Sequence, residues 1–486
     1  MGESIQGREH SAHRMSDAIA DMTLTAVADA IRRKKISSLE VTQGMLARID
    51  RLQPQLNCFI SVERDEVLKA ARKADRALAQ GANAGPLHGV PLAHKDMFYR
   101  AGKIATCGSK ILRNERQQIT ATVVERLAGA GALWLGGLNM GEFASDPTGG
   151  NEHFGRCHNP WNTHYVTGGS SSGSASAVAA RICHAALGSD TGGSIRTPAA
   201  LCGVVGFKPT NGRVSTYGAM ARAWSHDCVG PIARTVRDCA RIARVISGAD
   251  PRDPAASTEA VAHYEKQLRG SLKGLRIGVP ENYFYDSVAA DMQARMVESV
   301  AALKSLGARV VDITVPDPAH AFAMSVVMTE CESATYHAEW MRTRPQDYSP
   351  GVRARFAPGL EVPAVNYIEA QNERARLRAE FLATVFARVD LLHTPVMPVP
   401  VPTIAATQSE DPDNLRALIP LFTRNTRTAS FFSLPALSVP VGFTANGMPA
   451  AMQLIGRPFD EELVLRAGHA YQSVTDWHER APPLSG

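Results

Sequence analysis

Two clusters of glycine and serine lie close together in the sequence and could supply hydroxyl nucleophiles. Residues 168–173 read GGSSSG, and residues 191–194 read TGGS. Adjacent glycines mark sharp backbone geometry, because glycine has the widest conformational freedom of any residue. Successive backbone N–H groups around Gly192 and Gly193 could surround a developing negative charge. The pattern indicates chemistry at a carbonyl group, with a serine hydroxyl as the attacking group.

A lysine far from both clusters could act as the base that such a serine needs. Lys95 ends the apolar segment that starts at Val90, and Asp96 follows it. Burial at such a position lowers the pKa of a lysine from its ordinary value of about 10.4. Ser170 could then relay a proton from Ser194 to Lys95, which would be the Ser-Lys variant of a catalytic triad.

Other interpretations of these residues remain open at this point. A lysine is usually a solvated surface charge, and glycine–serine clusters are usually loops. Residues 169–173 also fit the pattern G-x-S-x-G, with Ser171 as the nucleophile. That pattern should follow a strand directly, whereas a turn-rich run precedes it here, so we discount it. No Gly-Lys-Ser or Gly-Lys-Thr ending supports a phosphate-binding loop. The pattern alone therefore indicates a serine hydrolase and goes no further.

The elements around these residues alternate between helices and strands, which predicts an α/β protein. Residues 24–52 should form two helices that divide near Ser37, and residues 318–390 should be mostly helical. Residues 139–167 are rich in Gly, Pro and Asn and should form a long functional loop. Further helices are expected at 65–80, 122–130, 234–247, 291–306 and 461–472, and strands at 57–62, up to Lys95, and at 132–136, 275–280, 308–313, 389–395 and 436–441.

The composition argues against several classes of function. The chain has 486 residues, a formal net charge of +5 and no block of Lys and Arg suited to nucleic acid. It lacks an apolar signal core and any apolar run long enough to span a membrane. Its eight cysteines are scattered without a C-x-x-C pair, so neither a metal site nor a disulfide framework is expected. We expect a cytoplasmic enzyme without membrane or nucleic-acid partners.

At this point several blocks of sequence resemble the amidase signature family. The resemblance rests on residues 168–175 and 188–199, on the lysine segment 89–96, and on residues 139–144, 159–162, 203–210, 227–231, 434–440 and 452–457. It implies a single amidase-signature domain over residues 1–486, with residues 1–22 as a flexible N-terminus. It also implies a mixed, mostly parallel β-sheet core surrounded by helices, and no metal or organic cofactor.

The resemblance assigns a role to each polar residue of the two clusters. It implies a Ser-cisSer-Lys triad in which Ser194 is the nucleophile, Ser170 is the bridging serine in a cis peptide, and Lys95 is the base. The oxyanion would be held by backbone N–H groups of Thr191, Gly192, Gly193 and Ser194. Ser171, Asp190 and Arg196 would support the network, with anion recognition as a lesser alternative for Arg196.

The chain departs from the family pattern where the substrate pocket is expected. Many members read T-x-P-F-N-x-T-G-x-P-A, whereas residues 426–436 here read TRTASFFSLPA. The wall formed there should therefore differ from that of other members. Candidates for an apolar acyl or aryl pocket are Phe98, Met140, Phe143, Phe431 and Phe432, although the same side chains could simply belong to the core.

Three functions follow from the resemblance. The first is an amidase that cleaves a small apolar or aryl amide, or an ester or carbamate, through an acyl-enzyme, with water as the only other reactant. The second is the glutaminase subunit of a tRNA-dependent amidotransferase, for which Arg353 or Arg355 would hold the α-carboxylate. The third, an inactive scaffold, is disfavoured because all three triad residues are present. Whether the chain forms a homodimer stays open.

Overall fold

One sheet of eleven strands runs through the molecule in the computed structural model, which describes residues 17–409 and 411–484. The strand order is β1-β3-β2-β4-β6-β5-β10-β11-β9-β7-β8. The strands are β1 (Phe59–Val62), β2 (Pro91–Lys95), β3 (Leu133–Leu138), β4 (Ala185–Asp190), β5 (Val205–Lys208), β6 (Cys228–Ala233), β7 (Arg276–Pro280), β8 (Arg309–Ile313), β9 (Leu391–Pro395), β10 (Ala436–Phe443) and β11 (Pro449–Ile455).

The sheet is mixed. Parallel pairing joins β2 to β3 and β4, and it joins β7 to β8 and β9. The remaining neighbours pair antiparallel. In the β2–β4 pair, Ala93 lies opposite Ala186 and His94 opposite Leu187. Because parallel strands end at the same edge, Lys95 and the turn after β4 come together there.

Helices cover the sheet and confirm the predicted α/β architecture. They are α2 (Leu24–Arg32), α3 (Ser38–Leu56), α4 (Arg64–Ala79), α5 (Thr122–Gly129), α6 (Ser172–Ala179), α7 (Arg196–Leu201), α8 (Val236–Ile246), α9 (Tyr264–Gln267), α10 (Ala290–Ser305), α11 (Pro318–Thr343), α12 (Pro350–Phe356), α13 (Ala364–Arg388), α14 (Pro412–Phe431) and α15 (Glu461–Gln472). Short 3₁₀ turns lie at Glu142–Ala144, Pro345–Asp347, Ala357–Leu360, Ala405–Thr407 and Trp477–Glu479.

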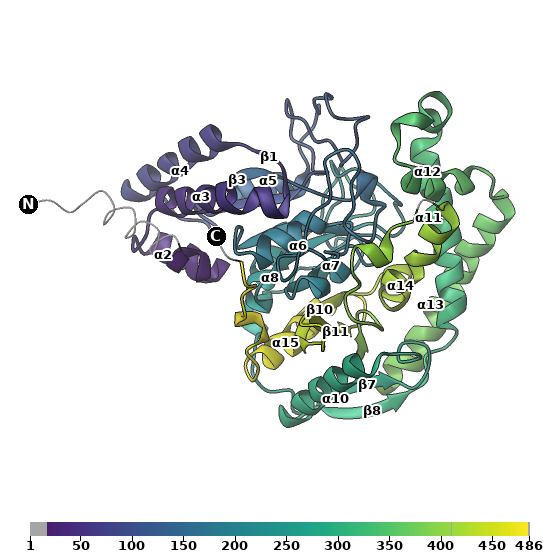
Figure 1. Ribbon diagram of the computed structural model, residues 1–486. Coiled ribbons are helices and arrows are strands. Elements are labelled where there is room, and N and C mark those ends of the chain that lie inside the picture. Colours follow the sequence, from purple (N-terminus) through teal and green to yellow (C-terminus); the bar gives the residue numbers. More distant parts are fainter. Residues whose placement is uncertain (1–16, 410, 485–486) are drawn as a thin grey trace, which may run out of the picture.

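The helices that matter for the site pack on the middle of the sheet. Helix α6 contacts β4, α7 contacts β5 and β10, and α14 contacts α7 and α11. Helices α11, α12 and α13 form a layer at the side of the molecule, next to α14 (Figure 1). All residues of α6 and α7 are buried. The cluster at residues 168–173 leads into α6, and the cluster at residues 191–194 precedes α7, so both are attached to buried helices.

The two predicted N-terminal helices are present, and their division has a clear local cause. Ser37 caps α3: its hydroxyl accepts from the backbone N–H of Glu40, and the Glu40 carboxylate accepts from the backbone N–H of Ser37. Such a capping box satisfies two backbone donors that a helix start leaves unpaired. Val41, Met45 and Ile49 on α3 are buried, as their helical spacing predicts.

The prediction of a flexible N-terminus over residues 1–22 is wrong for its last part. Residues 17–21 are helical, and Ile19 and Ala20 are buried. The carbonyl oxygen of Ile19 lies 3.0 Å from His184 Nε2, and Arg234 donates to the carbonyl oxygen of Asp21. This segment is therefore tied to the core. Residues 1–16 lie outside the described part of the chain.

Several elements were not predicted from the sequence. Strand β5 has only four residues, β6 contains a glycine followed by a proline, and β11 is buried along its whole length without alternation. Helix α14 contains Pro420, and an internal proline predicts the end of a helix. Among helices in the part of the chain that the structure describes, none is long and apolar enough to cross a membrane.

Candidate active site

Lys95 is fully buried at the carboxyl end of β2. Its Nζ donates to Ser170 Oγ at 2.7 Å and to Ser189 Oγ at 2.9 Å. Burial lowers the pKa of this amine to about 7, although the charges of Asp227 and Asp190 partly oppose the shift. A large fraction of the amine is therefore neutral near pH 7, and a neutral amine can accept a proton from Ser170.

Ser170 lies within hydrogen-bond distance of Lys95, as the resemblance implies for the bridging serine. The peptide bond between Gly169 and Ser170 is cis. The Ser170 side chain is fully buried, and its carbonyl oxygen accepts from the backbone N–H of Gly141. The contact with Lys95 brings together two residues that are 75 positions apart in the sequence.

Ser194 lies on the turn between β4 and α7 and is half-buried. It lines a small cavity of about 20 Å³ together with Gly169, the residue before Ser170. Among the residues that the structure describes, no hydrogen bond joins Ser194 Oγ to Ser170. Catalytic hydrogen bonds commonly tighten only when the substrate is bound. Ser194 therefore lies close to the segment that carries Ser170, whose side chain contacts the buried base.

The turn that carries Ser194 is held by a buried ion pair. The guanidinium of Arg196 donates to both carboxylate oxygens of Asp190, at 2.9 and 2.8 Å, and neither side chain is exposed. Burial alone would raise the pKa of Asp190, but Arg196 outweighs it and holds the pKa at about 2. Asp190 Oδ1 also accepts from the Gly193 N–H at 2.8 Å. The pair therefore fixes the shape of the turn.

The contacts of Asp190 and Arg196 bear on two expectations, namely the use of the Gly193 N–H as an oxyanion donor and the role of Arg196. Because the Gly193 N–H already donates to Asp190, it can serve an oxyanion only through a shared hydrogen bond. The Arg196 guanidinium also donates to the Thr426 carbonyl oxygen at 2.7 Å and to Ser430 Oγ at 2.8 Å. Its protein partners occupy it fully, which favours the supporting role over anion recognition.

Ser171 connects the first cluster to Ser189 on β4, just before the second cluster. Its Oγ lies 3.3 Å from both the backbone nitrogen and the carbonyl oxygen of Ser189. Ser189 in turn accepts from Lys95. Ser171 thus positions a partner of Lys95, consistent with the expected supporting role and not with that of a nucleophile.

The five apolar pocket candidates are core residues and do not line the cavity at Ser194. Phe143 packs against His337, Trp340 and Tyr348. Phe431 and Phe432 contact each other, and Phe432 packs on Phe381. The exposed fraction is at most 2% for all five: Phe98, Met140, Phe143, Phe431 and Phe432. The apolar pocket assignment is corrected accordingly, because these side chains fill the interior between the helices and the sheet.

The lining of the cavity at Ser194 includes three arginines beside Asp146, Phe422 and several small residues. The arginines are Arg222, Arg355 and Arg427. Arg355 was one of the two carboxylate candidates from the sequence, whereas Arg222 and Arg427 were not predicted. The signal for Arg427 was its place in the segment 426–436, which departs from the family pattern. Arg222 lies in a loop before β6 with no recognisable pattern.

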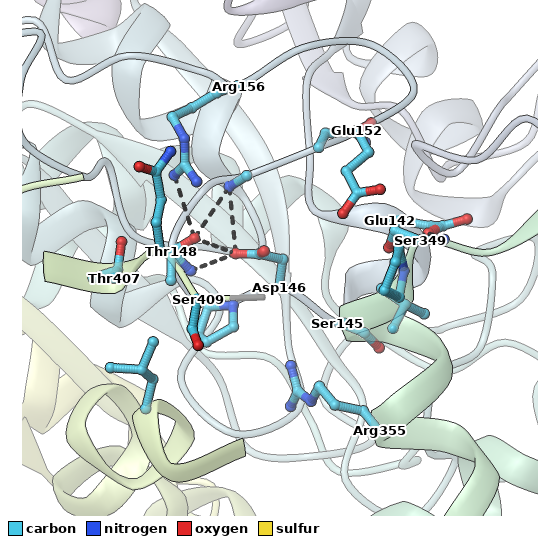
Figure 2. A pocket seen from close by; sticks show the side chains of 18 of the residues that line it. Glu142, Ser145, Asp146, Thr148, Glu152, Arg156, Ser349, Arg355, Thr407 and Ser409 are labelled. Atoms are coloured by element: carbon cyan, nitrogen blue, oxygen red, sulfur yellow. Dashed lines mark hydrogen bonds between the residues drawn. The ribbon is translucent and has the colours of Figure 1, made fainter. Parts of the chain in front are cut away.

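A second, larger cavity adjoins this one. It has a volume of about 790 Å³ and shares Asp146, Pro147 and Arg355 with the cavity at Ser194. Figure 2 shows Arg355 extending from α12 into the space that Asp146 and Thr148 border on the other side. Arg355 is therefore one of the residues at which the two cavities adjoin.

Comparisons with known proteins identify relatives over nearly the whole chain. The family model described as amidase matches residues 40–465. The A subunit of a glutamyl-tRNA(Gln) amidotransferase from Pseudomonas savastanoi pv. phaseolicola is 41% identical, over 95% of this chain and 99% of that protein. The crystal structure of the corresponding protein from Thermotoga maritima has 32% identity and a TM-score of 0.79, covering 96% of this chain and 97% of the other.

A further solved structure is similar over nearly its whole length. It is described as a vestigial protein complex that reveals the evolutionary origins of an s-triazine catabolic enzyme. It has 35% identity and a TM-score of 0.87, with 93% of this chain and 98% of that chain covered.

Proposed function

The chain belongs to the amidase family, whose members hydrolyse carbon–nitrogen amide bonds, and on that premise we propose that its substrate is a small amide bearing a carboxylate. The observation that carries this proposal is the lining of the cavity at Ser194 by Arg222, Arg355 and Arg427. In the described part of the chain none of the three forms an ion pair with a carboxylate. Guanidinium groups bind carboxylates through strong, charge-assisted hydrogen bonds.

The proton path starts at Lys95. The neutral amine of Lys95 accepts the Ser170 proton while Ser170 takes the proton of Ser194, and Ser194 Oγ attacks the amide carbonyl carbon. The carbon–nitrogen bond then breaks, and the proton returns through Ser170 to the leaving amine. Water attacks the acyl-Ser194 ester by the same path, which releases the acid and restores Ser194.

The negative charge that forms on the carbonyl oxygen is held by the turn after β4. The backbone N–H groups of Thr191, Gly192 and Ser194 are the donors, with Gly193 contributing through the hydrogen bond that it shares with Asp190. Asp190 and Arg196 keep this turn in place, so the donors need not reorganise during the reaction.

We place this activity in a protein assembly in the cytoplasm. The curated relatives are named as one subunit, designated A, of an amidotransferase that acts on glutamyl-tRNA(Gln). Their names favour the second of the three functions over the stand-alone amidase of an apolar or aryl amide, and they argue against the expectation of a chain without protein or nucleic-acid partners. Glutamine is the carboxylate-bearing amide that this role would use.

Arg355 is the residue that we assign to the substrate carboxylate. It is half-buried and lines both cavities, and its side chain forms neither a hydrogen bond nor an ion pair with any of the described residues. A substrate that enters through the larger cavity meets this guanidinium before it reaches Ser194. Arg353, the other candidate, is exposed and lines neither cavity.

The test is ammonia release from matched amides. Succinamate and glutamine carry a carboxylate, butyramide is neutral, and acetanilide (followed by aniline release) carries an aryl group. The chain is assayed alone and together with the proteins that remain bound when it is purified from its own cells, with and without tRNA. We expect carboxylate-bearing amides to have the higher kcat/KM. Faster hydrolysis of butyramide or acetanilide by the chain alone would overturn the proposal in favour of the stand-alone amidase.

A further inference from the structure

A third cavity lies apart from the two that adjoin at Arg355. Its volume is about 490 Å³, which is within the range of sites that bind small molecules. Its lining comes mainly from residues 97–99, 216–221 and 252–254, from the end of β4, from the start of β6 and from α11. No residue that lines it also lines either of the other two cavities. The third cavity is therefore a separate space in the molecule.

Aromatic rings form a large part of the wall of the third cavity. They are the side chains of Tyr99, Tyr217, Trp224, Tyr336 and Trp340. Trp224 is 46% exposed and Tyr336 is 45% exposed, and their ring centroids lie 5.5 Å apart in an edge-to-face arrangement. Two large rings that line a cavity and remain open to solvent are available to contact a ligand.

The charged side chains that line the third cavity give it a negative balance. Asp227 and Asp253 line it, and neither carboxylate forms an ion pair with any residue that the structure describes. The cation in the lining is Arg252, which pairs with Glu125 at 2.7 Å and with Asp250 at 3.2 Å. Because those two carboxylates already balance Arg252, the charge left for a ligand is that of Asp227 and Asp253.

Hydrogen bonds hold both carboxylates in place and leave each an acceptor site. Asp227 Oδ1 accepts from Thr191 Oγ1 at 2.6 Å, and Asp253 Oδ1 accepts from one backbone N–H at 2.9 Å. A carboxylate oxygen has two lone pairs, so each of these oxygens can accept a second hydrogen bond. Burial raises the pKa of Tyr336, and the charges of Asp227 and Glu332 raise it further. The aromatic wall therefore lies in a negative potential.

We propose that the third cavity binds a small organic cation with an aromatic ring, whose ammonium group lies at Asp227 and Asp253 and whose ring lies against Trp224 and Tyr336. The faces of tryptophan and tyrosine attract cations, and their edges and faces pack against other aromatic rings. A carboxylate adds a charge-assisted hydrogen bond to an ammonium group. This binding site is additional to the proposed function and does not depend on it.

The third cavity touches partners of two catalytic groups. Ser189 lines it, and Ser189 Oγ accepts from Lys95 Nζ at 2.9 Å. Asp227 lines it and accepts from Thr191, which belongs to the turn that carries the oxyanion donors. Arg222, which acts on Asp227 at longer range, lines the cavity at Ser194 instead. A ligand in the third cavity can therefore be bound while the substrate cavities are occupied, in contact with side chains that hold Lys95 and Thr191.

The experiment compares three probes that share one ring and differ in charge. Binding of benzylamine, benzyl alcohol and benzoate is measured by isothermal titration calorimetry at pH 7 on the full chain. We expect benzylamine to bind one molecule per chain, with a Kd at least about tenfold lower than those of the neutral and anionic probes. The titration is repeated on protein labelled at Ser194 with a small fluorophosphonate. We expect the Kd of benzylamine to stay within about twofold after labelling, because Ser194 does not line the third cavity.

Two variants locate the bound probe. Trp224→Ala and Tyr336→Ala should each raise the Kd of benzylamine by about fivefold or more. Both side chains are exposed, so their removal leaves no hole in the core. Phe459→Ala is the matched control: its ring is 37% exposed, lies over Arg213 and does not line the third cavity. This control should bind benzylamine as the wild-type protein does, and thermal unfolding verifies that each variant is folded.

Each contrary result counts against a stated part of the inference. Benzyl alcohol or benzoate binding as tightly as benzylamine would overturn the preference for a cation. An unchanged Kd in both Trp224→Ala and Tyr336→Ala would show that the probe binds elsewhere. Loss of binding after labelling of Ser194 would assign the probe to the substrate cavities, and the absence of saturable binding would overturn the site altogether. None of these results bears on the proposed function, which is judged by the hydrolysis of succinamate and butyramide.

Discussion

The Nζ of Lys95 and the Oγ of Ser170 are 2.7 Å apart, although 75 positions separate the two residues in the sequence. This contact exists because β2 pairs parallel with β4, and α6, which follows Ser170, packs on β4. It joins the buried amine of Lys95 to the hydroxyl of Ser170, the residue that follows Gly169 in the lining of the cavity at Ser194.

Replacement of Ser194 by alanine should abolish hydrolysis, because the acyl-enzyme cannot form. Covalent labelling by a fluorophosphonate, followed by mass spectrometry of the intact protein, is the measurement. Ser171→Ala is the control and should still be labelled, since Ser171 contacts Ser189. Labelling of the Ser194→Ala protein would rule out the assigned nucleophile.

Replacement of Lys95 by alanine should reduce kcat by about 10²–10⁴-fold, the range typical of general acid–base catalysis. In the wild-type protein, kcat/KM should rise with pH and level off above about 7. Only the deprotonated amine of Lys95 can accept a proton, and burial lowers the pKa of this amine to about 7. A pH–rate profile between pH 5 and 9 tests this. A profile that is flat across this range would contradict the role of Lys95 as base.

Burial of Lys95 should also lower the free energy of unfolding of the protein. The pKa of Lys95 is about 7 in the folded protein and 10.5 as the ordinary value, so below pH 7 the folded state carries a buried charge and the full cost applies. As the pH rises from 7 towards 10.5, the unfolded state alone keeps the proton and the cost declines. Lys95→Met should therefore raise the free energy of unfolding by roughly 3 kcal/mol at pH 6, and by less at pH 9, in denaturant titrations. An equal effect at both pH values would show that packing alone is responsible.

Removal of Arg196 should destabilise the protein, because it leaves Asp190 charged and buried without its partner. Arg196→Met is expected to lower the free energy of unfolding by about 3–5 kcal/mol. Arg376→Met provides the comparison, since Arg376 pairs with Glu373 on an exposed surface and should change stability by less than about 1 kcal/mol. Equal losses for the two variants would contradict the structural role of the buried pair.

Arg355→Gln should weaken substrate binding without altering the chemical step. We expect KM for succinamate to rise by about tenfold or more, the loss of a charge-assisted hydrogen bond, with kcat and the butyramide rate little changed. Arg353→Gln is the matched control two positions away, and its exposed side chain should not matter. An unchanged KM for succinamate in Arg355→Gln would remove Arg355 from the binding site.

Much of the fold was predictable because its local signals are strong. The capping box at Ser37 marks the start of α3, and residues 389–395, which end in a proline, mark β9. Elements without such signals were missed. Helix α14 carries an internal proline, and β11 is buried evenly on both faces, so neither shows the periodicity that identifies a helix or a strand.

The sequence by itself determined the chemistry of this protein, because Ser194, Ser170 and Lys95 lie in motifs whose residue types and order match the amidase signature. Only the tertiary structure decided what surrounds them. Burial of Phe143, Phe431 and Phe432 depends on how α11, α13 and α14 pack, and a sequence does not distinguish an aromatic side chain in the core from one in a pocket. The cluster of Arg222, Arg355 and Arg427 likewise arises from three distant segments that meet at one small cavity, and the charge that the substrate meets there is a property of their arrangement in space.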